Sequence, residues 1–186
     1  RTLGGPGGRT FEHDTIDAAL VSYLEAVAAL HQRLAGLEPE ALRQTEVHRR
    51  DRLGAWAIEY LATARDRGLA AMLAAAMERR YPAHPGQFVT GGGVQVFGNF
   101  DPEDDGRIMT VAEGFRRSVN LVFIRLMRDL VDHYMYAAPG SIGRILEDPG
   151  DTRRETYLAC FADREGAEFI RRLYRKDTGQ SADQAL

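Results

Sequence analysis

The sequence predicts a mainly α-helical fold with one or two short strands near residues 87–100. Two observations lead to this prediction. Apolar residues recur every three or four positions through most of the chain, which is typical of helices that bury one face. The stretch 87–100 (QFVTGGGVQVFGNF) departs from that spacing, because it mixes glycines with β-branched and aromatic residues that favour strands.

Composition limits the class of protein. A chain of 186 residues with 44% hydrophobic and 27% charged residues is typical of a folded domain with a substantial core. The net charge of −3 argues against a nucleic-acid-binding protein, which is normally basic, so we expect no nucleic-acid partner. The longest apolar stretch, 69–77, is far shorter than the roughly 20 residues of a membrane-spanning helix.

Residues 1–13 contain GGPGG and are predicted to form a flexible lead-in. The region 14–85 then shows helical spacing of apolar residues, with start signals such as Asp14, Pro39 and Asp51. These signals predict four helices that need a common core, at about 14–34, 39–47, from Asp51 to before Gly68, and 69–80.

A capping box marks the start of the next predicted helix. In Thr110-Val-Ala-Glu113 the threonine hydroxyl can accept from a first-turn amide while the glutamate reaches back to the Thr110 amide. Apolar spacing continues to Tyr134, and Pro139-Gly140 ends it. Shorter helices are predicted in the C-terminal segment, at about 141–147, 151–161 and 163–175.

Ser118 and Asn120 are unexpected within this apolar run. Small polar side chains compete with the backbone for hydrogen bonds, so they favour helix ends over helix interiors. Either they mark a local break in the helix, or they carry chemistry.

Other candidate sites have simpler explanations. Thr90-Gly-Gly-Gly-Val94 could hold a phosphate, but no lysine or helix follows it, which favours a structural turn. Asp129 and His133 share a helix face and could bind a metal, but no third ligand is near, and a solvated ion pair is the simpler prediction. We therefore expect no metal and no cofactor. The solitary Cys160 is predicted to be buried among apolar neighbours. A charged helix surface is the default prediction for Arg116, Arg117, Arg125 and Arg128.

One longer pattern consists of Asn99-Phe-Asp101, Gly106, Thr110-Val111, Phe115, Ser118-Val-Asn120, Val122 and Leu126. This pattern resembles a known family, the class A penicillin-binding proteins, which synthesise peptidoglycan. The resemblance is to the segment that carries the second active-site motif of their transpeptidase domain, and it covers about 94–130. It departs from the family at Gly114-Phe115, where Ala-Leu is usual, and at the more basic Arg116-Arg117. From Tyr23 to Lys176 the chain is also similar to a long-chain proteobacterial branch of the family.

The resemblance implies a fold and an activity. The chain would be the helical subdomain of an α/β penicillin-binding (β-lactamase-like) transpeptidase fold, with 14–85 as a helical insertion, 86–138 as the motif-bearing segment and 139–186 as C-terminal helices. The reaction would be D,D-transpeptidation through an acyl-serine. Ser118 would relay a proton to the leaving nitrogen, and Asn120 would bind the substrate's peptide amide and position the catalytic lysine. These roles require a break at 118–120.

The chain lacks part of that chemistry. No serine is followed three residues later by lysine, so the nucleophile and its base would precede Arg1 in a longer parent. Lys176-Asp-Thr178-Gly179 contains an inserted residue and is not expected to be the Lys-Thr-Gly motif. The chain alone is therefore predicted to be inactive. The resemblance also implies a membrane-anchored parent at the periplasmic face, with peptidoglycan stem peptides and β-lactams as ligands.

Two other interpretations stay open. The chain could be a non-catalytic helical scaffold of a cell-envelope protein, in which case residues 110–136 form an uninterrupted helix or Ser118 is inaccessible. It could also be a degenerate transpeptidase-like domain that binds peptidoglycan peptides, or a partner synthase, without turning them over.

Overall fold

The computed structural model describes residues 13–90, 93–163 and 167. The chain divides into two compact units, one ending at residue 137 and the other beginning at residue 138. The described part is mainly helical and carries two small antiparallel sheets, as the sequence predicts for its fold class.

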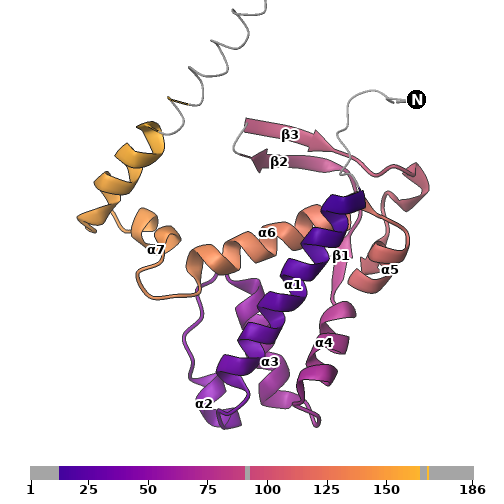
Figure 1. Cartoon of the computed structure of the whole chain (residues 1–186), viewed down its shortest axis with the longest axis horizontal. Coiled ribbons are helices and arrows are strands. Elements are labelled where there is room, and N and C mark those ends of the chain that lie inside the picture. Colours follow the sequence, from indigo (N-terminus) through magenta and orange to yellow (C-terminus); the bar gives the residue numbers. More distant parts are fainter. Residues whose placement is uncertain (1–12, 91–92, 164–166, 168–186) are drawn as a thin grey trace, which may run out of the picture. The chain divides into compact units, whose positions relative to one another are not determined.

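The first unit contains most of the regular structure (Figure 1). Its elements, in chain order, are α1 (His13–Leu34), α2 (Pro39–Arg43), α3 (Arg52–Thr63), α4 (Leu69–Met77), β1 (Arg80–Pro82), β2 (Gly86–Thr90), β3 (Gly93–Phe97), the 3-10 helix η1 (Pro102–Asp104), β4 (Ile108–Thr110), α5 (Val111–Arg116) and α6 (Asn120–Tyr136).

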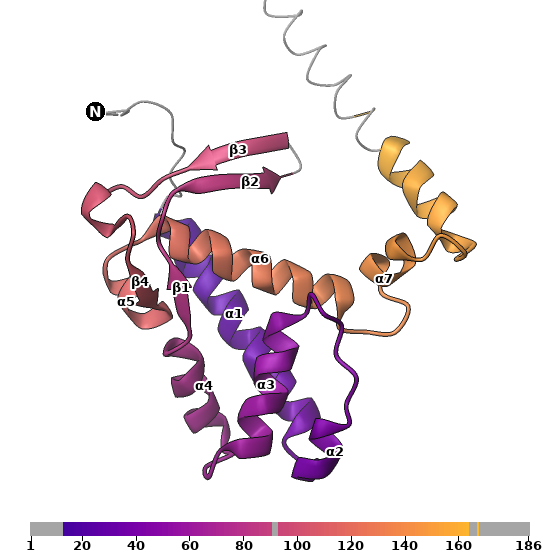
Figure 2. The same cartoon turned by 180° about the vertical axis from the view of Figure 1, so that it is seen from behind.

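The core of this unit lies where α1 packs against α3, α4 and α6 (Figure 2). Tyr23 on α1, Leu53 on α3 and Phe123 on α6 are all buried in one cluster. A domain boundary was predicted between residues 85 and 86. Residues on both sides of it share a single core, because α6 packs against the helices that precede the boundary.

Local signals fixed several helix ends. Asp51 caps α3 as predicted, since its Oδ1 accepts from the Gly54 amide at 2.8 Å. Two helices end earlier than predicted: α2 at Arg43 and α4 at Met77. The second difference has a clear cause, because Arg80–Pro82 forms β1 and pairs with β4 instead of continuing the helix.

Of the two sheets, one was predicted from the sequence and the other was not. Strands β2 and β3 form an antiparallel hairpin in the register Gly86↔Phe97 and Thr90↔Gly93, which confirms the strands predicted near 87–100. Strands β1 and β4 pair Arg80 with Thr110 and were not predicted. Each has three residues, and their pairing joins segments far apart in the sequence, so no local pattern reveals it.

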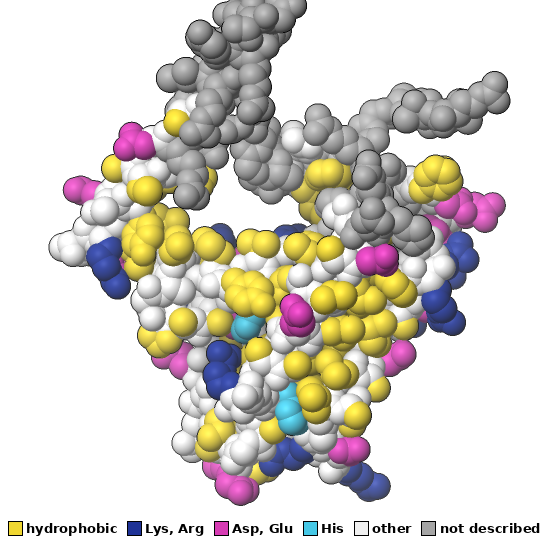
Figure 3. Space-filling view, viewed as in Figure 1, with side chains coloured by type: hydrophobic (Ala, Val, Ile, Leu, Met, Phe, Trp, Pro, Cys, Tyr) yellow, Lys and Arg dark blue, Asp and Glu magenta, His cyan; other side chains and the backbone are white. Residues whose placement is uncertain are grey.

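Part of the apolar surface of the first unit stays exposed. Figure 3 shows hydrophobic side chains gathered over α1 and α4, where Val21 is 56% exposed. None of the helices in the described residues combines the length and the apolar character that crossing a bilayer requires.

The second unit is helical where it is described. It contains α7 (Ile142–Glu147) and a helix over 153–163, which begins two residues later than predicted. Asp151 accepts from the Arg153 amide at 2.9 Å, and its bonds to Arg153 lower the pKa of its carboxyl to about 2. Cys160 is exposed, so the prediction of a buried thiol was wrong. The helix predicted at 163–175 falls almost entirely outside the described residues, as do Lys176–Gly179 and residues 1–12.

Candidate functional site

A sharp turn separates α5 from α6. Helix α5 ends at Arg116 and α6 begins at Asn120, so the break expected at 118–120 is present, and the uninterrupted helix over 110–136 is excluded. Ser118 has φ 54°, the one positive φ of a non-glycine residue in the described part of the chain. A side chain in this left-handed conformation costs about 1–2 kcal/mol, because Cβ crowds the following carbonyl oxygen.

The predicted capping box fixes the start of α5. The Glu113 amide donates to Thr110 Oγ1 at 3.0 Å, and the Thr110 amide donates back to Glu113 Oε2 at 2.9 Å. That second bond is the main reason why the pKa of the Glu113 carboxyl lies below its ordinary value. Both partners predicted from the sequence are therefore confirmed.

Two backbone hydrogen bonds fix the end of α5. The amide of Ser118 donates to Phe115 O at 3.1 Å, and that of Val119 donates to Gly114 O at 2.9 Å. A Cβ added to Gly114 would lie 2.8 Å from Val122 Cγ1 on α6. Gly114 therefore allows α5 and α6 to approach closely at this turn.

Ser118 and Asn120 lie in the same turn but differ in accessibility. Ser118 is half-buried, whereas Asn120 is only 2% exposed and its Nδ2 donates to Gly98 O at 2.8 Å. The Asn120 amide nitrogen thus holds a neighbouring loop in place. Contact of Asn120 with a substrate stays a prediction.

Asn99 joins the same turn from the loop after β3. Its Oδ1 accepts from the Leu121 amide at 3.0 Å, while its Nδ2 donates to Ala83 O and to Asp105 Oδ1, both at 2.7 Å. Asn99 belongs to the sequence pattern over 94–130, but no role was predicted for it. An asparagine after a strand is a weak signal, since most such residues only form turns.

An ion pair between the buried Asp104 and the exposed Arg117 anchors the acidic loop 101–107 beside the turn. Asp104 is 3% exposed, and its Oδ1 accepts from Arg117 Nε at 2.9 Å and Nη2 at 2.6 Å. This bond raises the pKa of Arg117. The loop and the residue that precedes Ser118 are therefore fixed to each other.

A shallow hollow of about 330 Å³ opens next to this ion pair. Arg107, Glu113, Arg116 and Arg117 line it. Two of its three arginines face Asp104, Arg117 at 2.6 Å and Arg107 at 3.8 Å between nitrogen and oxygen. Much of its positive charge is therefore already neutralised by the protein.

Arg125 lies on the inner face of α6, so the prediction of an exposed charged surface was wrong for this residue. It is 7% exposed, and its guanidinium donates to Pro82 O at 2.9 Å and to His84 O at 2.8 Å. It also lies 5.2 Å from the centre of the Phe88 ring, which joins the hairpin to α6. Burial is the main cause that lowers the pKa of Arg125.

Asp129 occupies the next turn of the same face. Its Oδ2 accepts from the Tyr81 hydroxyl at 2.9 Å and from Arg79 Nη2 at 3.1 Å. The Arg79 guanidinium lies between 5.3 and 5.9 Å from the ring centres of Trp56, Tyr81 and Tyr23. Burial raises the pKa of the Tyr81 hydroxyl, which stays protonated and donates to the carboxylate.

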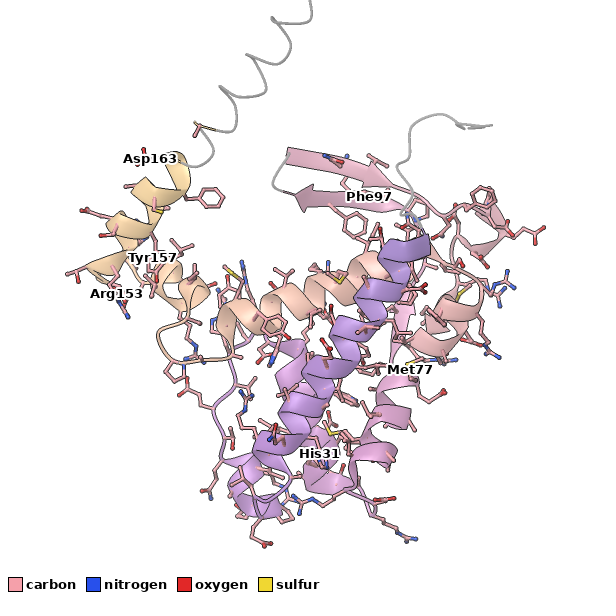
Figure 4. All side chains as sticks on the ribbon, viewed as in Figure 1. His31, Met77, Phe97, Arg153, Tyr157 and Asp163 are labelled. Carbon is pink, nitrogen blue, oxygen red and sulfur yellow. The ribbon has the colours of Figure 1, made fainter. Side chains whose placement is uncertain are left out.

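His133 and Asp129 do not pair with each other, so the prediction of a solvated ion pair was wrong. His133 is buried, and its Nδ1 donates to Asp51 Oδ1 at 2.9 Å. His31 is remote from it, since its Nε2 donates to Arg67 O at 2.9 Å at the C-terminal end of α1 (Figure 4). Within the described residues, no group of three or more His, Cys, Asp or Glu side chains is placed to hold a metal ion.

The glycine-rich stretch predicted as a turn joins two strands. Thr90 ends β2 and Gly93 begins β3, and no helix follows directly. This is the context of a hairpin and differs from that of a phosphate-binding loop, which leads into a helix N-terminus. Residues 91 and 92 lie outside the described part.

No protein-family model, no curated protein and no solved structure matches this chain.

Proposed function

We propose that this chain is a segment of a penicillin-binding D,D-transpeptidase that cross-links peptidoglycan through an acyl-serine intermediate. The segment supplies the second active-site motif, Ser118-Val-Asn120. The nucleophilic serine and its lysine base come from other parts of the parent protein, so the segment alone acylates nothing. Two kinds of support exist: the sequence resemblance over 94–130 and the geometry of the turn at Ser118.

The left-handed conformation of Ser118 carries the proposal. Glycine adopts φ 54° at no steric cost, yet a serine stands here between two helices. Strained residues persist where the surrounding structure holds them, and they are concentrated at functional sites. Left-handed residues are common at helix C-termini, where glycine is usual, and we infer that the hydroxyl is the reason why serine stands here. Proton transfer is the chemistry that a hydroxyl supplies at a transpeptidase site.

In the proposed reaction, Ser118 Oγ passes a proton toward the leaving nitrogen as the acyl-serine forms. Asn120 opens α6 beside it and positions the substrate amide and the catalytic lysine. The substrates are peptidoglycan stem peptides, and β-lactams react as their analogues. This reaction belongs at the periplasmic face of the inner membrane, where the parent is anchored by parts outside this segment.

Labelling of the full-length parent with a fluorescent penicillin tests the proposal. We expect Ser118→Ala to lower the acylation rate by about 10²–10⁴-fold, the usual contribution of a positioned proton-transfer group. Ser118→Gly should lower it equally while unfolding no more easily than the wild type, because glycine removes the strain. Ser22→Ala on α1 is the matched control and should label normally. A folded parent that takes up no label, or a Ser118→Ala variant that labels at the wild-type rate, would overturn the proposal.

The burial of Asn120 favours a second candidate. With 2% exposure and its Nδ2 on Gly98 O, this residue can hold the turn without meeting a substrate. The chain would then belong to a degenerate transpeptidase-like domain that binds stem peptides or a partner synthase without reaction. A parent that binds a stem pentapeptide in calorimetry, but forms no covalent adduct with penicillin, would identify this function.

A further inference from the structure

Asn99 uses its side-chain amide to join three segments of the first unit. Its Oδ1 accepts from the Leu121 amide at 3.0 Å, and its Nδ2 donates to Ala83 O and Asp105 Oδ1 at 2.7 Å each. One oxygen and both N–H bonds of the amide are thus engaged, which fixes its orientation. A flipped amide would place two donors face to face at Leu121.

The bond to Leu121 replaces a helix cap. The first amides of α6 have no partner within the helix, and a polar side chain at the N-cap would normally accept from them. The N-cap residue here is Val119, whose side chain cannot accept a hydrogen bond. Asn99 supplies the missing acceptor from 22 residues upstream in the sequence.

A second bond runs in the opposite direction between the same two segments. Asn120 Nδ2 donates to Gly98 O at 2.8 Å. Gly98-Asn99 and Asn120-Leu121 therefore exchange two hydrogen bonds, each from one side chain to the other segment's backbone. We call this pair of bonds the asparagine clamp. It fixes the first turn of α6 against the loop that follows β3.

The clamp holds the α6 side of the turn that contains Ser118. On one side of the turn, the amides of Ser118 and Val119 are bound to carbonyls of α5. On the other side, the clamp begins at Asn120. A strained left-handed residue keeps its conformation only when both of its ends are held, and the clamp holds the α6 end.

We propose that Asn99 is a positioning residue of the reaction, acting through Ser118 without touching the substrate. This inference rests on the proposed transpeptidase function. Because a catalytic group displaced by about 1 Å can cost 10²-fold in rate, loss of the clamp should affect the chemical step more than penicillin binding.

The test uses stopped-flow acylation of the full-length parent by a fluorescent penicillin, with the binding constant and the acylation rate constant measured separately. For Asn99→Ala we expect the acylation rate constant to fall about 10–100-fold, with the binding constant changed less than about threefold. Val27→Ala removes buried methyl groups from α1 without touching the turn. It controls for lost stability and should acylate at the wild-type rate.

A rescue pair separates positioning from simple loss of structure. Asn99→Asp keeps the acceptor for Leu121 but sets a carboxylate oxygen against both Asp105 Oδ1 and Ala83 O, so it should acylate slowly. Adding Asp105→Asn restores the bond between positions 99 and 105 with donor and acceptor exchanged, and should recover at least about tenfold in acylation rate. If Asn99→Ala fails to fold, the comparison of these two variants decides the question.

The outcomes distinguish the two proposals. If the folded wild-type parent takes up no label, the transpeptidase function fails, and the role of Asn99 fails with it. If Ser118→Ala is slow while Asn99→Ala acylates at the wild-type rate, the positioning role alone is overturned. Equal rates for Asn99→Asp with and without Asp105→Asn overturn it as well.

Discussion

The two ends of α6 are attached to the protein by different kinds of interaction. Its first turn is held by neutral amides, in the bonds that Asn99 and Asn120 make with the backbone. Its second half is held by carboxylates, because Asp129 accepts from Arg79 and Asp51 accepts from His133. Both ends are buried, so the difference lies in the chemistry of the contacts and not in their exposure.

The first turn of α6 sets the geometry of the neighbouring turn, and the second half of α6 attaches the helix firmly to the rest of the protein. Each neutral bond adds roughly 0.5–1.5 kcal/mol net, but its direction is strict, which suits a turn whose angle matters. A buried ion pair tolerates small shifts, and breaking it from one side leaves an uncompensated charge at a cost of about 3–5 kcal/mol. A substitution at the first turn of α6 should therefore alter mainly the geometry of the turn. A substitution in the second half should lower mainly the free energy of unfolding.

The largest effect on stability is expected from Asp129→Ala. The change leaves the Arg79 guanidinium, whose side chain is 13% exposed, without its carboxylate. The free energy of unfolding should fall by about 3–5 kcal/mol, measured by urea denaturation of the parent or of this chain. Asp17→Ala, an exposed carboxylate on α1, is the control and should change it by less than about 0.5 kcal/mol.

A double variant sharpens this result. Replacing both partners with apolar residues, Arg79→Met with Asp129→Leu, should recover most of the lost stability, because no unpaired charge stays buried. If the double variant is as unstable as Asp129→Ala, the packing of the aromatic rings around Arg79 stabilises the protein more than the charges do.

At the other end of α6 we expect a smaller effect from Gly114→Ala. The new Cβ would meet Val122 Cγ1 at 2.8 Å, so α5 and α6 must separate slightly, at a cost of about 1–3 kcal/mol. Thermal denaturation measures it. Gly114→Ala combined with Val122→Ala relieves the contact and should cost less than the sum of the two single changes. Simple additivity would show that α5 and α6 do not touch there in solution.

The smallest effect concerns the pH dependence of the capping box. The folded state lowers the pKa of Glu113, so its contribution to stability is complete above the ordinary glutamate pKa and is lost as pH falls through the lowered value. Melting temperatures measured from pH 6 down to pH 3 should therefore fall less steeply for Glu113→Gln than for the wild type. Parallel curves would mean that the carboxylate gains nothing from the Thr110 amide.

Local signals in the sequence predicted the turn well. Thr110 and Glu113 stand at the spacing of a capping box, and both of their bonds exist. Ser118 and Asn120 interrupt an apolar run, and the helix does break there. Each of these features depends on residues within about one turn of each other, which is the range over which the sequence determines structure directly.

The partners of buried polar residues could not be predicted. Asp129 and His133 share a helix face, so helical spacing pairs them with each other, yet each binds a residue at least 48 positions away. Asn99 was missed as part of the site for the same reason, since its bond to Leu121 spans 22 residues. Long-range polar contacts depend on how the helices pack, and the spacing of residues along one helix does not predict that packing.

The binding of Arg125 has a consequence for how this protein tolerates sequence change. Its guanidinium bonds the carbonyl oxygens of Pro82 and His84, and every amino acid offers such an oxygen. A substitution at position 84 therefore changes the side chain without removing the carbonyl oxygen that Arg125 binds. At position 125, no other side chain offers the same fork of N–H donors. A saturation library should show a permissive position 84 and a position 125 that accepts almost nothing but arginine.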